Sequence, residues 1–176
     1  QISTGKKENK FGVNEKEFLK LVSYCQNSKN INLECLSVHI GSQILDHKPY
    51  EKMLNVVDKI IVKTKHKFKF IDIGGGMGIS YNEGSKKLNY RKYNIAIKKF
   101  LRRHSSKIIF EPGRSIVGDV GYLISKVIYI KENDKKNFII LDAAMNDLMR
   151  PALYGANHKT LPSIKRHQIS KKIYEF

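Results

Sequence analysis

The sequence predicts an α/β fold that begins with parallel βαβ units and continues into a β-rich region. Two patterns support this prediction. Up to Arg114, apolar residues at helical spacing alternate with short continuous apolar runs, which is typical of helices and parallel strands in turn. Beyond Arg114 the helical spacing stops, and two apolar runs flank a charged segment.

Three helices are expected in the first part of the chain. One covers roughly residues 14 to 28, where apolar side chains recur every three or four positions. The same spacing indicates helices around residues 53–61 and 90–104. Between them, strands are expected at Leu33–Ile40 and Phe68–Ile73, and a further strand at Lys107–Phe110.

Chemically useful residues follow these strands at equal intervals. His39, Gly75 and Glu111 each stand at the C-terminal end of a strand, and 36 residues separate each from the next. In a barrel or in a doubly wound sheet, the C-terminal ends of parallel strands open on one face. We therefore expect these three residues to converge on one site.

The last part of the chain predicts antiparallel β structure. Ile116–Ile130 and Phe138–Leu141 are apolar, and the charged segment Lys131–Asn137 separates them as a turn. We place the domain boundary near residue 117, so that residues 1–117 form the first domain and residues 118–176 begin a second, β-rich one.

The strongly basic composition does not predict a nucleic-acid partner. The net charge is +17, but 27 of the 33 basic residues are Lys and only 6 are Arg, spread over every expected helix and loop. Proteins that bind nucleic-acid phosphates concentrate Arg, or combine basic and aromatic residues on one face. No run approaches the roughly 18 apolar residues of a membrane span, so we expect no membrane role.

The cysteines and histidines do not predict a metal site. Cys25 is expected on a helix and Cys35 on a strand, and they do not form a CxxC pair. The six His residues show no HxxxH or HExxH spacing, so no metal is expected. A reducing compartment, the cytoplasm, is the expected location.

The segment Asp72–Gly78 contains four glycines directly after a strand. It fails the dinucleotide pattern GxGxxG, because Ile79 stands where the third Gly is required. It fits the glycine-rich loop of methyltransferases that bind S-adenosylmethionine, and it also fits a phosphate-binding loop in a barrel. A plain tight turn would need only one or two glycines. The motif by itself leaves the first two interpretations open.

Three further segments carry polar side chains suited to a cofactor or a substrate. In Glu111-Pro112-Gly113-Arg114, the carboxylate suits a protonated heterocyclic nitrogen and the guanidinium suits a phosphate or carboxylate. His39, followed by Gly41-Ser42, offers a flat surface for an aromatic cofactor and a hydroxyl for its phosphate.

The third segment runs from Met145 to Tyr154. Its Arg150 and Tyr154, four residues apart, suit a substrate carboxylate. Pro151 is expected to keep Arg150 out of a helix.

Five segments together resemble one known family. In chain order they are Lys10–Gly12, His39–Gln43, Asp72–Gly76, Glu111–Arg114 and Met145–Tyr154. This order is similar to that of the fold-type III, or alanine-racemase-like, pyridoxal-phosphate-dependent decarboxylases. The last segment, with His158 after it, most resembles the branch that acts on diaminopimelate.

The resemblance implies a partial (β/α)8 TIM-type barrel followed by the start of a C-terminal β domain. It implies that His39 lies against the ring of pyridoxal 5'-phosphate and that Glu111 pairs with the pyridine nitrogen. It further implies roles for two sets of residues. The phosphate would be held by Ser42, Gly75, Gly76, Pro112, Gly113 and Arg114, and a substrate carboxylate by Arg114, Arg150 and Tyr154.

The implied reaction is decarboxylation of meso-2,6-diaminopimelate to L-lysine by a homodimer. Decarboxylases for ornithine, arginine or carboxynorspermidine share the cofactor residues and remain an alternative. The family's Schiff-base Lys, in a Tyr-Ala-x-Lys segment, is expected upstream of Gln1, and its Cys-Glu-Ser segment downstream. The chain is therefore expected to be an internal fragment with about four of eight barrel strands and no activity alone.

Overall fold

The computed structural model describes residues 11–81, 84 and 86–164, so Lys10 of the first resemblance segment lies outside the described residues. The chain divides into two compact units. The first unit comprises residues 1–80 and 84–120, and the second comprises residues 81–83 and 121–176.

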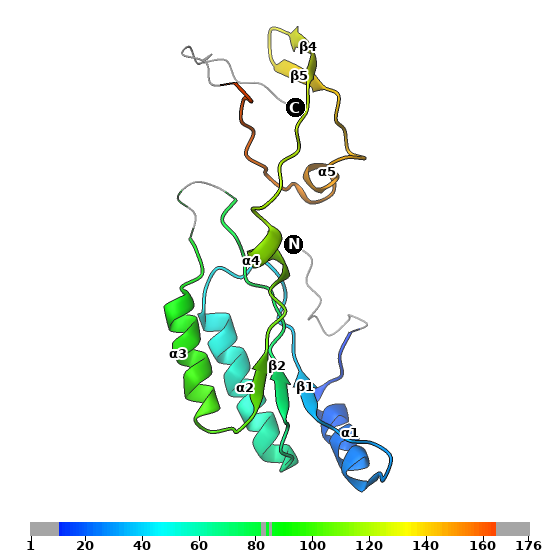
Figure 1. The fold of residues 1–176 in the computed structure, drawn as a ribbon. Helices are drawn as coiled ribbons and strands as arrows, with labels where there is room; N and C mark the ends of the chain where they lie inside the picture. Colours follow the sequence, from blue (N-terminus) through cyan, green and yellow to red (C-terminus); the bar gives the residue numbers. More distant parts are fainter. Residues whose placement is uncertain (1–10, 82–83, 85, 165–176) are drawn as a thin grey trace. The chain divides into compact units, whose positions relative to one another are not determined.

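The first unit contains a parallel sheet, as the alternating pattern predicts. Its strands are β1 (Cys35–Ser37), β2 (Phe70–Asp72) and β3 (Lys107–Ile109), in the order β1-β2-β3 (Figure 1). The strands are shorter than predicted, but backbone hydrogen bonds extend the pairing beyond them. Val38, for example, donates to the carbonyl of Asp72 over 2.8 Å. The described residues supply three strands rather than about four.

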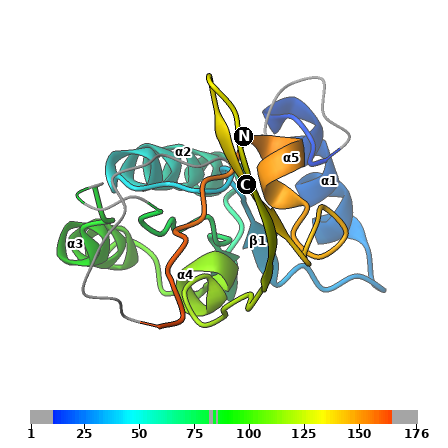
Figure 2. The same cartoon turned by 90° about the horizontal axis from the view of Figure 1, so that it is seen from above.

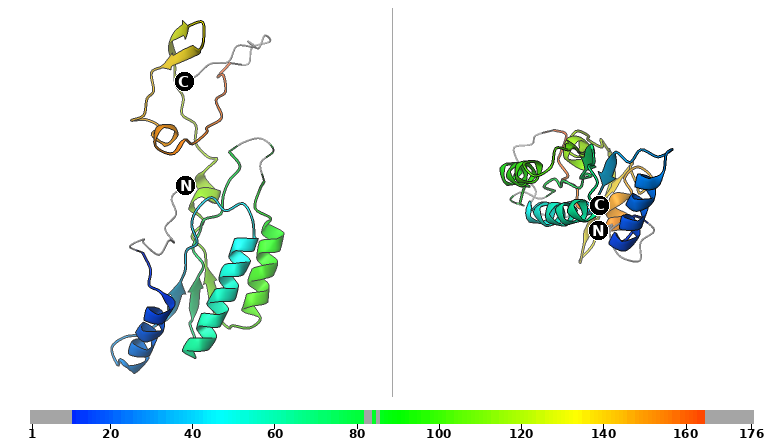
Figure 3. Two further views of the ribbon diagram at one scale, coloured as in Figure 1. Left: turned by 180° about the vertical axis from the view of Figure 1, so that it is seen from behind. Right: turned by 90° about the horizontal axis from the view of Figure 1, so that it is seen from below.

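The three predicted helices are present, and side-chain caps mark where two of them begin. They are α1 (Glu15–Asn27), α2 (Lys48–Thr64) and α3 (Tyr90–Leu101). Asn14 and Glu17 form a capping box at the start of α1, and the Asn89 side chain caps α3. Helices α2 and α3 lie side by side on one face of the sheet (Figures 1, 2 and 3).

The core of the first unit lies between the sheet and these helices. Leu36 pairs with Ile71 in register, and they are 3% and 0% exposed. Because side chains alternate along a strand, Ser37 and Asp72 point to the opposite face. There the Ser37 hydroxyl donates to Asp72 Oδ2 over 3.0 Å. One face of the sheet is therefore sealed by apolar packing, and the other carries polar groups.

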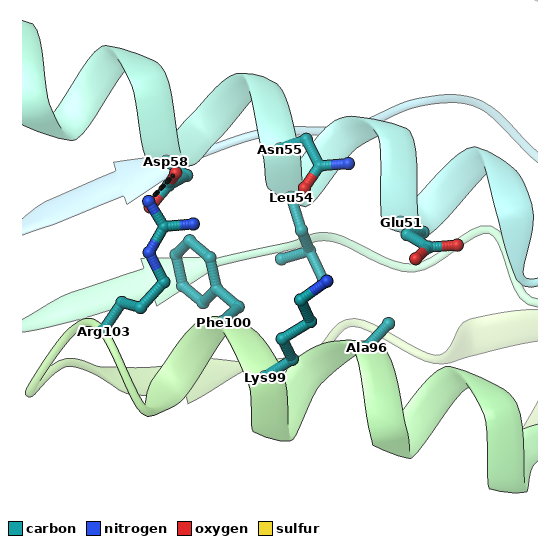
Figure 4. A pocket seen from close by; sticks show the side chains of 8 residues that line it. All are labelled: Glu51, Leu54, Asn55, Asp58, Ala96, Lys99, Phe100 and Arg103. Atoms are coloured by element: carbon teal, nitrogen blue, oxygen red, sulfur yellow. Dashed lines mark ion pairs between the residues drawn. The ribbon is translucent and has the colours of Figure 1, made fainter.

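A buried carboxylate joins α2 to the end of α3. Asp58 of α2 accepts hydrogen bonds from Arg103 Nη2 and His104 Nε2, both over 2.7 Å (the Arg103 pair is drawn in Figure 4). Asp58 is only 8% exposed, and a buried charge is tolerated when it is paired. The Asp58–Arg103 and Asp58–His104 pairs therefore fix the C-terminal end of α3 against α2.

The described part of the second unit is built around an antiparallel hairpin, as predicted. Its strands are β4 (Val127–Glu132) and β5 (Asn137–Leu141). The predicted bounds of the first strand are wrong. Residues at the start of the predicted run belong to the short helix α4 (Gly113–Val117), and β4 continues into the charged segment. The turn is shorter than expected, with Asn133 donating to the Lys136 carbonyl over 3.0 Å.

The prediction that Pro151 keeps Arg150 out of a helix is wrong. Arg150 begins helix α5 (Arg150–Tyr154), with Pro151 in its first turn. The first turn of a helix has no intrahelical partners for its N–H groups, so a proline costs little there. The helix ends at Gly155, which adopts the left-handed conformation.

Apolar side chains on the second unit are widely exposed. Every residue of β4 is exposed, and Tyr122 and Ile124 are each 88% exposed. Contiguous exposed apolar surface on a folded protein is typical of sites that contact another molecule. Among the described residues, no helix is long and apolar enough to cross a membrane.

Two valines on α2 test the core of the first unit. Val57 is 1% exposed and Val62 is 64% exposed. We expect Val57→Ala to lower the free energy of unfolding by about 2 kcal/mol, through lost burial and a residual cavity. Val62→Ala, on the solvent side of the same helix, should change it by less than about 0.5 kcal/mol. Chemical denaturation measures both, and equal losses would contradict this core.

Candidate functional site

The C-terminal ends of the three parallel strands are aligned. The register pairs Ser37 with Asp72 and Asp72 with Ile109. When this strand register is continued by two residues towards the C-terminal ends, His39, Gly74 and Glu111 lie side by side. The Glu111 N–H donates to the Gly74 carbonyl over 2.9 Å. A Cβ added to Gly74 would lie 2.7 Å from Nδ1 of His39. His39 and Glu111 therefore flank the glycine segment, and Gly74 rather than Gly75 lies directly between them.

The glycine loop, residues 74–78, is packed tightly against both neighbouring strand ends. A Cβ on Gly75 would overlap the carbonyl oxygen of Glu111, and one on Gly76 would overlap that of Gly41. A Cβ on Gly78 would come within 3.0 Å of the Gln43 backbone. A plain tight turn would need only one or two glycines, so the turn alone does not account for four. All four glycines are required by close approach, whatever the loop binds.

Gln43 links the first loop to the other two. Its Nε2 donates to the Ile79 carbonyl over 2.6 Å, and its Oε1 accepts from the Ile79 N–H over 3.3 Å. The same oxygen accepts from Nη1 of Arg114 over 3.0 Å. Gln43 therefore helps to set the direction of the Arg114 guanidinium. It ends the His39–Gln43 segment, but no role was predicted for it.

Two further residues, missed by the sequence reasoning, hold the glycine loop from its own strand and from α2. Asp72 Oδ1 accepts from the Gly74 N–H over 2.9 Å. The Tyr50 hydroxyl donates to the Gly75 carbonyl over 3.0 Å. Asp72 could have been found from its sequence position, because it is an acidic residue just before the glycines. Tyr50 could not, because an aromatic residue on a helix is expected for core packing alone.

Tyr50 belongs to a buried tyrosine pair behind the glycine loop. Its ring centroid lies 4.6 Å from that of Tyr93, and the two side chains are 0% and 4% exposed. Burial raises the pKa of Tyr50, and it raises the pKa of Tyr93 to about 12. Both hydroxyls therefore stay protonated at physiological pH, and Tyr50 is a constant hydrogen-bond donor.

The open side of this strand edge offers groups for an anionic, aromatic cofactor. His39, Ser42 and Glu111 are exposed to solvent. Within the described part of the chain, the N–H groups of Gly75 and Gly76 donate to no protein acceptor. Successive unpaired N–H groups in a glycine-rich loop suit a phosphate. The residues thus fit a phosphorylated cofactor.

Arg150 and Tyr154 lie on α5 in the second unit. Nη1 of Arg150 donates to the hydroxyl of Tyr81 over 3.1 Å, and its guanidinium carbon lies 5.3 Å from the centre of that ring. The Tyr81 ring in turn packs edge-to-face with the His158 ring, with 6.0 Å between the ring centroids. The partner that positions Arg150 is therefore Tyr81, while Tyr154 is 52% exposed.

No group of three or more His, Cys, Asp or Glu among the described residues could hold a metal ion.

Residues 1–118 match the family model described as pyridoxal-dependent decarboxylase, pyridoxal binding domain. Two curated relatives are named diaminopimelate decarboxylase. The one from Aquifex aeolicus is 40% identical over 164 residues, which cover 92% of this chain and 39% of the relative. The one from Helicobacter pylori is 42% identical over 160 residues, covering 89% and 39%. The chain thus spans about two fifths of the length of these relatives.

Solved structures are similar over the same region. Diaminopimelate decarboxylase from Helicobacter pylori, complexed with L-lysine, matches with a TM-score of 0.82 at 42% identity, covering 90% of this chain and 40% of that one. A lysine/ornithine decarboxylase from Vibrio vulnificus matches with a TM-score of 0.73 at 20% identity, which shows the fold alone. The methyltransferase interpretation of the glycine loop is not supported by these matches.

Adding one methyl group to the glycine loop tests its packing. We expect Gly75→Ala to lower the free energy of unfolding by roughly 3 kcal/mol, because the new Cβ would overlap the Glu111 carbonyl oxygen. Gly121→Ala is the matched control, since no atom lies within 4 Å of its added Cβ. Thermal or chemical denaturation measures both. A Gly75→Ala protein as stable as the control would show that the loop is not packed in this way.

Proposed function

The chain belongs to the pyridoxal-dependent decarboxylase family, and we propose that the full-length protein decarboxylates meso-2,6-diaminopimelate to L-lysine. One observation carries the choice of substrate. The chain is 42% identical to a diaminopimelate decarboxylase whose structure was solved with L-lysine, the expected product. The alignment of His39, Gly74 and Glu111 at one sheet edge supports a shared cofactor site.

The cofactor of this proposal is pyridoxal 5'-phosphate. The N–H groups of Gly75 and Gly76 donate to its phosphate, together with the Ser42 hydroxyl and the backbone N–H of Arg114. Their support is that both glycine N–H groups lack an acceptor in the described part of the protein. Pro112 and Gly113 shape the turn that carries Arg114, and the Gly113 N–H donates to the Glu111 carbonyl over 2.9 Å. His39 lies against the face of the pyridine ring, a role supported by its exposed position beside Gly74.

Glu111 keeps a proton on the pyridine nitrogen in this proposal. An exposed carboxylate beside Gly74 can accept a charge-assisted hydrogen bond from a protonated ring nitrogen. When bound, the cofactor supplies an electron sink for the electron pair left behind as CO2 departs, and the protonated ring deepens it. Glu111 thus acts on the rate of decarboxylation more than on cofactor affinity.

Arg114, Arg150 and Tyr154 bind a substrate carboxylate. The planar guanidinium donates two parallel hydrogen bonds to a carboxylate, which fixes its orientation. Gln43 supports Arg114 in this role, and Tyr81 supports Arg150. Arg150 with Tyr154 suits a substrate that carries a second α-amino acid centre, which ornithine and arginine lack.

The larger assembly is part of the same proposal. We place residues 1–117 in a (β/α)8 barrel and residues 118–176 at the start of a β domain. A homodimer would cover part of the apolar surface around Tyr122 and Ile124. A cytoplasmic location agrees with the free cysteines Cys25 and Cys35.

Substrate comparison tests the activity. With pyridoxal phosphate present, we expect the full-length protein to release CO2 from meso-diaminopimelate with a kcat/KM roughly 10³-fold above that for ornithine or arginine. The 176-residue chain alone should release none, because none of its Lys residues stands in the Tyr-Ala-x-Lys segment of the family's Schiff-base Lys. Comparable rates with ornithine or arginine would favour the related decarboxylases instead.

Neutralising Glu111 tests the ring-nitrogen role. We expect Glu111→Gln to lower kcat by roughly 10² to 10³-fold, because a neutral amide no longer stabilises the protonated pyridine nitrogen. Cofactor affinity should fall much less. Glu51→Gln, an exposed position on α2, is the control and should keep wild-type kcat. A Glu111→Gln enzyme with unchanged kcat would remove this role.

A further inference from the structure

Tyr50 connects the helical layer to the glycine loop. It lies in the first turn of α2 and is 0% exposed, and its hydroxyl donates to the Gly75 carbonyl over 3.0 Å in a buried hydrogen bond. Phosphate-binding loops work through backbone N–H groups, so any residue that fixes a loop peptide also fixes the direction of its N–H.

The geometry of one peptide unit gives this contact its consequence. The bond between Gly75 and Gly76 is trans, so its carbonyl and its N–H point in opposite directions. The carbonyl faces Tyr50 on α2. The N–H of Gly76 therefore points away from the helical layer, and it has no acceptor in the part of the chain that the structure describes.

A peptide flanked by two glycines needs such an anchor. Glycine readily exchanges between positive and negative φ, and Gly76 has a φ of +83°. Rotation of the Gly75–Gly76 peptide would turn the N–H of Gly76 away from a ligand. The buried Tyr50 hydrogen bond opposes that rotation, because the Gly75 carbonyl would lose its partner away from water.

We propose that Tyr50 is a positioning residue for cofactor binding: its hydroxyl holds the Gly75–Gly76 peptide so that the N–H of Gly76 donates to the cofactor phosphate. This inference rests on the proposed function, since it requires a phosphorylated cofactor at the glycine loop. Tyr50 does not touch the cofactor and acts through the backbone.

The neighbouring tyrosine provides a matched control. Tyr93 packs against Tyr50 and is 4% exposed, but its hydroxyl has no hydrogen-bond partner among the described residues. Tyr50→Phe and Tyr93→Phe each remove one buried hydroxyl and keep the ring. They differ in that only the Tyr50 hydroxyl holds the glycine loop.

The test measures dissociation constants of the full-length apoprotein for pyridoxal 5'-phosphate and for pyridoxal, which lacks the phosphate, by absorbance titration. We expect Tyr50→Phe to weaken binding of the phosphorylated form about fivefold, equivalent to roughly 1 kcal/mol, and to leave pyridoxal binding unchanged. Tyr93→Phe should change neither constant.

The outcomes separate the possible failures. If Tyr50→Phe weakens both ligands equally, or lowers only the melting temperature, Tyr50 is structural and the proposal is overturned. If the wild-type protein does not prefer the phosphorylated form, the proposed function itself fails. Should Tyr50→Phe not fold, 3-fluorotyrosine at position 50 keeps the hydroxyl as a stronger donor. It should tighten binding of the phosphorylated form alone, and an unchanged constant would overturn the proposal.

Discussion

The structure of the first unit depends on the close approach of three backbone segments at the ends of its parallel strands. The glycine loop has no side chains at residues 74–76, so the carbonyl of Gly41 approaches from one side and that of Glu111 from the other. Larger residues would push these segments apart. The same approach fixes where His39 and Glu111 stand, so the packing of the sheet edge and the geometry of the site have one cause.

The elements of the fold were largely predictable because their signals are local. Helical spacing located α1, α2 and α3, and the charged segment located the hairpin. The errors arose where the outcome depends on context. A proline such as Pro151 disrupts the interior of a helix but is tolerated in its first turn. No local sequence signal indicates that a helix begins at Arg150. The apolar run from Ile116 likewise does not reveal that α4 occupies its start.

The sequence located the loops of the site but not the residues that hold them. Its motifs pointed to exposed side chains at the strand ends, such as His39 and Glu111. Gln43 and Tyr50 act instead on backbone groups that are 36 and 25 residues away along the chain. Such contacts leave no periodic or local pattern. Tyr50 also lies on the apolar face of α2, where an aromatic residue is expected for packing alone.

The alternation of side chains along the strands explains why the residues of the candidate site face away from the helices. Along each strand the buried residues Leu36 and Ile71 alternate with Ser37 and Asp72, which lie on the other face. His39 follows Ser37 by two residues, and the sheet pairing continues beyond the strand through the Val38 N–H. His39 is exposed accordingly. A shift of one residue in register would exchange the two faces and direct the imidazole into the apolar layer. The burial of two aliphatic side chains in the core therefore determines which side of the sheet His39 faces.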